Sequence, residues 1–223
     1  MDRVSDPVAA RTPTIVTLLV ALSGPPLLAA AGQRRGDAHL SVPTVLLFQM
    51  AMWALAALVI FVVTRVEHRP LASIGLRRPR WATLVTGLAL ALVLLYLLPA
   101  VAAWMMNHLG LPGAERGVSQ LRGIPRWALL LAAVTGGVVE ETIYRGYAIE
   151  RLAALTGRYW VAGILAALAF GLAHVPGWGA YAVVDFIFGL FATALYLWRR
   201  DLLANIIAHV TGLAVALTRL PGA

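Results

Sequence analysis

Long apolar runs recur along the whole chain, and they constrain its fold more than any other feature. A helix needs about 20 mostly apolar residues to cross the ~30 Å hydrocarbon core of a bilayer. Seven runs approach this length: Thr14–Ala31, Pro43–Thr64, Ala82–Met106, Trp127–Ile149, Trp160–Val175, Ala180–Trp198 and Leu202–Thr218. Because two of these runs are short, six to eight spans fit the pattern, and seven are preferred. The sequence therefore predicts an all-α polytopic membrane protein.

The composition agrees with a chain that faces lipid. Hydrophobic residues make up 61% of the 223 residues and charged residues only 13%, whereas a soluble domain usually carries about 25% charged residues. The apolar runs leave no room for a separate soluble domain, so residues 1–223 are expected to form a single membrane domain. Cysteine is absent, which excludes disulfides, thiolate catalysis and Cys-ligated metals.

The basic residues indicate a bilayer partner and an orientation. The net charge is +8, and every basic residue apart from histidine is arginine. Binding to nucleic acid needs a contiguous basic face, but these arginines flank the apolar runs, so we expect contact with lipid phosphates and no nucleic acid. With seven alternating spans, 11 arginines fall on one side and 6 on the other. Since arginine-rich loops stay inside, the N-terminus is predicted to be cytoplasmic.

The fourth run contains ionisable side chains, which cost about 2.5–3.5 kcal/mol each inside a membrane and therefore need a reason. Glu141 and Arg145 are four residues apart, so they share a helix face and can form an ion pair. Glu140 points about 100° away, on the face of Tyr144. A structural ion pair accounts for Glu141 and Arg145 but leaves Glu140 unexplained. Glu140 is therefore the candidate for acid–base chemistry.

Three later runs contain further polar groups. Phe170 and His174 are four residues apart, as are Asn205 and His209, and Asp185 lies in the sixth run. Taken singly, His174 could be a packing residue, Asn205 could join two helices, and Asp185 is as readily structural as catalytic. Taken together with the glutamate pair, these groups could activate a water molecule inside an intramembrane cavity.

These residues carry a resemblance to a known family. The stretch EETIYR at 140–145 resembles the EExxxR motif of the CPBP family, the CAAX-protease and bacteriocin-processing (Abi-type) intramembrane peptidases. FGLAH at 170–174 resembles the family's FxxxH motif, and the stretch around His209 resembles its third, HxxxN-type motif. SIGLRR at 73–78 is similar to a short loop ahead of the core. The resemblance defines a peptidase-like core at 71–218 and leaves the N-terminal spans within 1–70 outside it.

The resemblance implies an activity and a role for each motif residue. Glu140 would act as the general base on the attacking water, while His174 and His209 would orient that water or stabilise the oxyanion. Glu141 and Arg145 would hold the helix and tune Glu140. The implied function is a CAAX-protease-like intramembrane endopeptidase that hydrolyses a membrane-associated protein or peptide. We expect it in a bacterial cell membrane.

One position departs from the family pattern. Four residues after His209, where the family has Asn or Asp, this chain has Leu213. An apolar side chain can orient neither a water molecule nor an oxyanion. Either Asn205 or Asp185 substitutes for the missing group, or activity is reduced or lost.

The sequence leaves metal dependence open. Glu140, His174 and His209 could supply the three protein ligands of a catalytic zinc. However, no HExxH helix is present to place two histidines one turn apart. We therefore favour catalysis by glutamate and histidine without a cofactor, and keep a divalent metal such as zinc as the alternative.

Two other functions fit part of the pattern. A catalytically weakened family member could act as a membrane binding or immunity protein. A transporter or proton relay could also use buried acids and histidines, but transporters are usually built from two related halves, and no internal repeat is found in this sequence.

The depth of the motif residues sets a condition on the fold. His174 lies about 22 Å into the fifth span from its cytoplasmic end, whereas Glu140 and His209 lie nearer that end. Contact between them requires either a long fourth helix or a turn at 177–179 that stops within the membrane, where irregular backbone must line a cavity.

Overall fold

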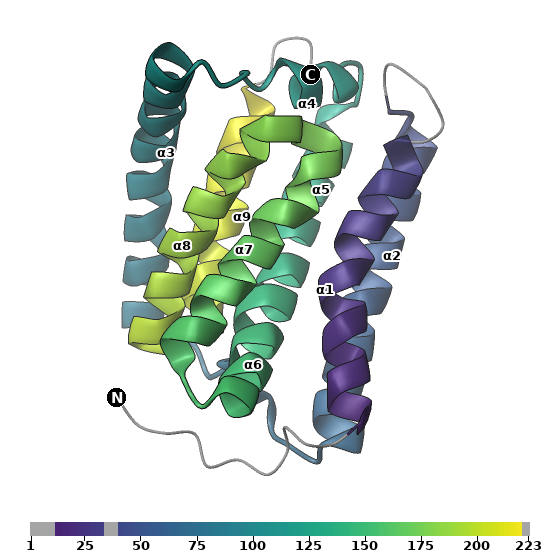
Figure 1. The fold of residues 1–223 in the computed structure, drawn as a ribbon, viewed down its shortest axis with the longest axis vertical. Helices are drawn as coiled ribbons and strands as arrows, with labels where there is room; N and C mark the ends of the chain where they lie inside the picture. The colour runs from purple at the N-terminus through teal and green to yellow at the C-terminus, as the bar shows by residue number, and fades with distance from the viewer. Residues whose placement is uncertain (1–11, 34–39, 220–223) are drawn as a thin grey trace.

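The computed structural model describes residues 12–33 and 40–219, which form a helical bundle with no strand among them. Seven rods run side by side along the long axis of the molecule (Figure 1). They are α1 (Thr12–Gln33), α2 with η2 (Val42–Phe61, Val62–Val66), α3 (Trp81–Leu109), α5 with η4 and α6 (Arg126–Thr135, Gly136–Ala148, Ile149–Thr156), α7 (Tyr159–Trp178), α8 (Ala182–Arg199) and α9 (Leu202–Thr218). Each apolar run of the sequence corresponds to one rod, which confirms the predicted fold class.

The rods have the length and surface of membrane spans. Within the part of the chain that the structure describes, five helical stretches are long and apolar enough to cross a bilayer: Thr12–Gln33, Val42–Val66, Trp81–Leu109, Arg126–Thr156 and Tyr159–Arg199. The last stretch contains both α7 and α8, and α9 is a shorter apolar helix. Large apolar side chains point outward from several rods, among them Leu19, Met50, Leu92 and Leu172. The chain is an integral membrane protein.

Local sequence signals start and stop these helices. Ser41 caps α2 by accepting a hydrogen bond from the backbone N–H of Thr44 at 3.3 Å, and Asp201 caps α9 in the same way. Such caps satisfy backbone donors at a helix N-terminus that lack an intrahelical partner. Gly110 and Gly157 end α3 and α6 with positive φ angles, which glycine adopts without steric cost.

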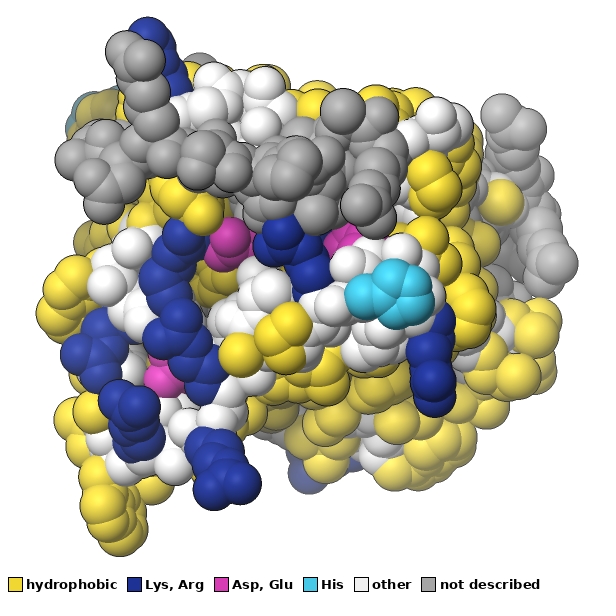
Figure 2. All heavy atoms as spheres, turned by 90° about the horizontal axis from the view of Figure 1, so that it is seen from below, with side chains coloured by type: hydrophobic (Ala, Val, Ile, Leu, Met, Phe, Trp, Pro, Cys, Tyr) yellow, Lys and Arg dark blue, Asp and Glu magenta, His cyan; other side chains and the backbone are white. Residues whose placement is uncertain are grey.

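The connections between the helices lie at the two opposite ends of the bundle. The α2–α3 connection with η3 (Leu71–Ile74), the α6–α7 turn and the α8–α9 turn lie at one end, and α4 (Glu115–Gln120) and η5 (Gly179–Tyr181) lie at the other (Figure 1). We call the first the arginine-rich end, because arginine side chains gather on it (Figure 2). Its described arginines are Arg65, Arg69, Arg77, Arg78, Arg80, Arg151, Arg158, Arg199 and Arg200.

The fourth rod is the centre of the fold. It is continuous from Arg126 to Thr156, longer than the predicted Trp127–Ile149, and its middle segment η4 has the wider π-helical form. Two glycines of η4 allow close packing: Gly137 meets Val210 of α9, and Gly146 meets the backbone of Ile74. The rod therefore fixes its polar residues against several neighbouring helices.

Both features named in the depth condition are found: the fourth rod is long, and the turn after α7 is packed against other parts of the protein. The turn that follows α7 is half-buried and lies under α4, where Arg116 donates a hydrogen bond to the carbonyl of Pro176 at 3.0 Å. Trp178 packs directly on Gly117 of α4. The turn expected at 177–179 lies two residues later, at Gly179–Tyr181, because α7 continues through Trp178.

Candidate active site

Glu141 is held by groups from two elements. Its side chain is fully buried, and Oε1 lies 2.9 Å from Nη1 of Arg145 and 2.9 Å from Nδ1 of His209. Asn205 donates from Nδ2 to Oε2 at 3.3 Å. The ion pair predicted from the i, i+4 spacing is therefore present, and α9 contributes two further donors. A buried carboxylate needs such partners to remain charged.

Glu140 lies on a different face of η4 and remains accessible. Its side chain is 15% exposed, compared with 0% for Glu141. The nearest ring nitrogen of His209, Nε2, lies 3.9 Å from Oε2 of Glu140. The imidazole of His209 thus stands between the two carboxylates. Because Glu141 can only accept a hydrogen bond, Nδ1 of His209 carries a proton and Nε2 is directed toward Glu140.

His174 and Asp185 belong to the same group of charges. Nδ1 of His174 donates to the carbonyl of Phe170 at 2.9 Å, which leaves Nε2 for other partners. Asp185 and Glu140 are the acidic groups that interact electrostatically with His174, and Asp185 also interacts with His209. Oδ2 of Asp185 is buried and has no hydrogen-bond partner within the described part of the chain. The structure therefore brings Asp185 to the motif residues.

Aromatic side chains enclose this group. Phe170 is buried, and its ring centroid lies 5.2 Å from that of Tyr144 and 4.6 Å from that of His174. The guanidinium of Arg145 lies 4.3 Å from the same centroid. Phe188 of α8, which the sequence analysis did not single out, lies 4.5 Å from the ring of His209. Interactions between charges are stronger in such surroundings than in water.

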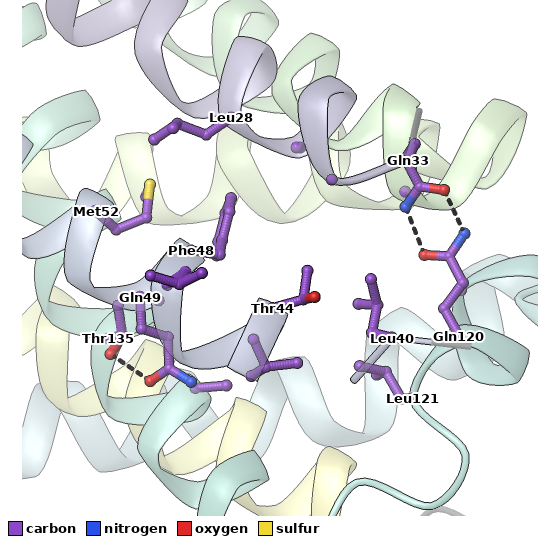
Figure 3. A pocket seen from close by; sticks show the side chains of 18 of the residues that line it. Leu28, Gln33, Leu40, Thr44, Phe48, Gln49, Met52, Gln120, Leu121 and Thr135 are labelled. Atoms are coloured by element: carbon purple, nitrogen blue, oxygen red, sulfur yellow. Dashed lines mark hydrogen bonds between the residues drawn. The ribbon is translucent and has the colours of Figure 1, made fainter. Parts of the chain in front are cut away.

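A cavity of about 400 Å³ reaches Glu140 from the end of the bundle that carries α4. It runs between α1, α2 and the fourth rod, with Leu28, Phe48 and Met52 on its walls (Figure 3). The side-chain amides of Gln33 and Gln120 form reciprocal hydrogen bonds of 2.8 and 3.0 Å at one end of it (Figure 3). Residues from α1 and α2 thus line the cavity, although both helices lie in the N-terminal part that carries no motif.

Leu213 and Asn205 differ in what they face. Leu213 lines the cavity, and a Cβ placed on Gly136 would meet Leu213 at 3.1 Å and Oε1 of Glu140 at 3.9 Å. Asn205 is not among the residues that line this cavity; its Nδ2 donates to Glu141 and, at 2.7 Å, to the carbonyl of Ala192. Asn205 therefore supports Glu141, and the apolar side chain of Leu213 occupies the wall beside Glu140.

The donor set for a metal is incomplete in this geometry. Within residues 12–33 and 40–219, no three side chains of His, Cys, Asp or Glu are grouped so that they could hold a metal ion. Of the three ligands considered from the sequence, His209 uses one ring nitrogen for Glu141. Its other nitrogen, Nε2, is 3.9 Å from Oε2 of Glu140, a separation that two ligands lying about 2.0–2.2 Å from one zinc can span.

The fold and the site define a polytopic membrane protein with a buried group of acidic and imidazole side chains. Residues 122–213 match the family model of the Type II CAAX prenyl endopeptidase Rce1-like proteins. The matched segment contains Glu140, His174 and His209 and ends at Leu213, and it confirms the resemblance to the CPBP intramembrane peptidases over this part of the core. The match supports an intramembrane protease in general terms. No curated protein and no solved structure matches the chain.

Proposed function

We propose that this protein is an intramembrane endopeptidase in which Glu140 activates the attacking water. The observation that carries the proposal is the contrast between two adjacent carboxylates. Glu141 is enclosed by Arg145 and His209, whereas Glu140 lies on a cavity large enough to admit a substrate segment. A general base must be free to take a proton from a water molecule within hydrogen-bond reach.

The geometry leaves a place for that water. A water molecule beside the line from Nε2 of His209 to Oε2 of Glu140 could lie about 2.8 Å from both atoms, since they are 3.9 Å apart. In the proposed reaction Glu140 takes one proton from the water, and the water oxygen forms a bond to the carbonyl carbon of the substrate. Glu140 then gives the proton to the leaving nitrogen as the peptide bond breaks.

The two histidines are proposed to hold the water or the oxyanion. Each uses Nδ1 for a fixed acceptor, Glu141 for His209 and the carbonyl of Phe170 for His174. A fixed Nδ1 determines the orientation of the ring and directs Nε2. Protonated Nε2 atoms would donate to the oxyanion of the tetrahedral intermediate, and unprotonated ones would accept from the water.

We also propose that the reaction proceeds without a metal ion. The chemistry above uses only Glu140 and the histidine rings, and no step requires a Lewis acid. If zinc were present instead, Glu140, His174 and His209 would hold it, and the zinc would lower the pKa of its bound water.

The orientation of the site is part of the proposal. Arginine-rich ends of membrane proteins face the cytoplasm, which places the N-terminus inside and the α4 end outside a bacterial cell membrane. The cavity extends from the α4 end toward Glu140. A membrane-associated protein or peptide would therefore reach Glu140 from the non-cytoplasmic half of the bilayer.

Leu213 favours a second candidate function. Because this apolar side chain takes a position on the cavity wall beside Glu140, one polar contact to the oxyanion is missing. A protein that retains the cavity but has lost efficient catalysis could bind a membrane peptide without cleaving it, as an immunity protein would. The two functions differ in turnover and share the binding cavity.

The proposal is tested by Glu140→Gln in proteoliposomes, with cleavage of a prenylated CAAX-type peptide followed by mass spectrometry. We expect the variant to lose turnover by at least about 10²-fold, as loss of a general base does, while its melting temperature stays unchanged. Glu115→Gln, which alters an exposed carboxylate on α4, is the matched control and should cleave normally. Cleavage by Glu140→Gln at the wild-type rate would remove Glu140 as the base.

A further inference from the structure

A second cavity, of about 250 Å³, lies at the arginine-rich end, far along the fourth rod from the Glu140 cavity. We call it the arginine pocket. Among the described residues, four arginines and one acidic residue, Glu150, line it, and the arginines come from the α2–α3 connection, α6 and the C-cap of α8. These arginines are Arg69, Arg77, Arg151 and Arg200. The lining therefore carries a net positive charge.

Fixed interactions hold part of the pocket wall in place. Glu150 forms an ion pair with Arg200 and accepts hydrogen bonds from the hydroxyls of Tyr196 at 2.8 Å and Tyr159 at 3.2 Å. Arg200 also lies over the ring of Tyr159, 3.8 Å from its centroid. This arrangement keeps the wall rigid before any ligand binds, which lowers the entropic cost of binding.

Arg151 forms another fixed part of the wall. It is buried and makes a two-point ion pair with Glu67. Thr14 and Tyr147 donate to the same carboxylate at 2.9 and 3.3 Å. The acceptor positions of Glu67 are thus taken up inside the bundle, and Glu67 does not line the pocket.

Two polar groups of the pocket have no partner among the described residues. Arg77 is exposed and forms no hydrogen bond or ion pair with another described side chain. Oγ of Ser73 is enclosed and has no hydrogen-bond partner within residues 12–33 and 40–219. A buried hydroxyl without a partner costs free energy, so an acceptor in the pocket would satisfy both groups at once.

Tryptophan side chains indicate where the pocket lies relative to the bilayer. Trp81 opens α3, Trp160 lies in the first turn of α7, and Trp198 lies at the end of α8, all near the arginine-rich end. Their exposed fractions are 82%, 47% and 72%. Exposed tryptophan is enriched at the membrane–water interface. The pocket therefore lies at the level of the lipid headgroups, where phosphate is the abundant anion.

We propose that the arginine pocket binds a phosphate group, and that an anionic phospholipid of the adjoining leaflet supplies it. Arg77 supplies the positive charge, Arg77 and Ser73 donate to the phosphate oxygens, and the paired Arg151 and Arg200 hold the wall in place. Basic pockets between membrane helices on the cytoplasmic side are suited to lipid headgroups. This site is separate from the Glu140 cavity and does not depend on the proposed protease activity.

The experiment is a binding titration of the delipidated protein in neutral detergent, read by native mass spectrometry. The probes are phosphatidylglycerol, phosphatidylcholine and inorganic phosphate, each against the wild type, Arg77→Gln and Arg78→Gln. Arg78 is the matched control because it is the next arginine in the chain and does not line the pocket. We expect phosphatidylglycerol to bind about tenfold more weakly to Arg77→Gln, which loses a charged hydrogen bond, and normally to Arg78→Gln.

Other outcomes separate the sources of the phosphate or overturn the site. Inorganic phosphate that binds as tightly as phosphatidylglycerol, with the same dependence on Arg77, would replace the lipid with a soluble ligand. Equal weakening by Arg77→Gln and Arg78→Gln would show a diffuse charge effect and overturn the pocket, as would the absence of any preference for phosphatidylglycerol over phosphatidylcholine. If Arg77→Gln does not fold, Ser73→Ala serves in its place, with an expected loss of about threefold.

Discussion

His209 is held by Glu141 through its Nδ1 atom at 2.9 Å, and this contact directs its Nε2 atom toward Glu140. The imidazole ring of His209 therefore contacts Glu141 directly and lies near Glu140, which is the basis for the different roles proposed for the two glutamates. A buried carboxylate that fixes the tautomer and orientation of a histidine is a recurring device in hydrolases. In the proposed reaction Glu141 is a positioning residue, and Glu140 is the group that lines the cavity.

The first prediction concerns Glu141. Glu141→Gln leaves the buried guanidinium of Arg145 without its counter-charge, and breaking a buried ion pair from one side costs about 3–5 kcal/mol. We expect a clear drop in melting temperature in detergent together with loss of turnover. Glu140→Gln should lose turnover alone. Differential scanning fluorimetry and a cleavage assay on the two variants measure this contrast.

A compensating change sharpens that test. Arg145→Met in the Glu141→Gln background removes the unpaired charge and should recover part of the stability. Turnover should not recover, because Nδ1 of His209 still lacks its anionic acceptor. Recovery of both quantities would mean that Glu141 serves stability only. An unchanged melting temperature in Glu141→Gln would contradict the buried pair itself.

The second prediction concerns metal. Turnover should survive dialysis against a strong chelator, since no step of the proposed reaction uses a metal ion. Elemental analysis of the dialysed protein establishes how much metal remains. Loss of activity that stoichiometric zinc restores would make Glu140, His174 and His209 ligands. The same experiment on Glu115→Gln controls for damage during dialysis.

The third prediction concerns orientation, and the absence of cysteine makes it direct to test. Arg78→Cys at the arginine-rich end and Glu115→Cys on α4 each introduce one exposed thiol. In intact cells, a membrane-impermeant maleimide should label Glu115→Cys and leave Arg78→Cys unlabelled until the membrane is opened. The reverse pattern would mean that the protein has the opposite orientation in the membrane. Labelling of both variants or of neither in intact cells would mean that the two ends are not separated by the bilayer.

Much of the architecture follows from local patterns in the sequence. Apolar runs of about 20 residues predict the rods because length and hydropathy are local properties. The Glu141–Arg145 pair follows from a spacing of four residues within one helix. The fourth rod nonetheless extends to Thr156, seven residues beyond the predicted end at Ile149, because charged residues such as Glu150 and Arg151 find partners in the fold and do not end the helix.

Contacts between residues that are far apart in the chain could not be predicted from such local patterns. The Glu67–Arg151 pair joins the residue that follows η2 to the fourth rod, and no spacing rule links the two residues. Phe188 looks like any other apolar residue of its span, yet it contacts the ring of His209. The cavity walls from α1 and α2 are apolar and therefore carry no signal that separates them from lipid-facing side chains. The π-helical form of η4 likewise depends on packing and has no simple sequence pattern.

The last prediction concerns Leu213 and the two residues that could replace its function. Asn205 donates to Glu141 and to the carbonyl of Ala192, so its amide is committed to the buried side of the site. Asn205→Ala should therefore lower stability and turnover together, as loss of a support for Glu141 does. Asp185 interacts electrostatically with His174, and its Oδ2 has no hydrogen-bond partner among the described residues, but a carboxylate cannot donate to an oxyanion unless it is protonated.

Leu213→Asn places an amide donor on the cavity wall beside Glu140, and the cavity of about 400 Å³ has room for it. Removal of one oxyanion donor lowers turnover by about 10²–10³-fold in hydrolases, so adding one should raise turnover by about tenfold or more. Leu213→Met keeps the wall apolar at similar volume and should have no effect. The gain should persist in Asn205→Ala/Leu213→Asn, because the two side chains act on different groups. If Leu213→Asn leaves turnover unchanged while Asn205→Ala alone abolishes it without loss of stability, Asn205 already supplies the oxyanion contact and Leu213 is not a defect.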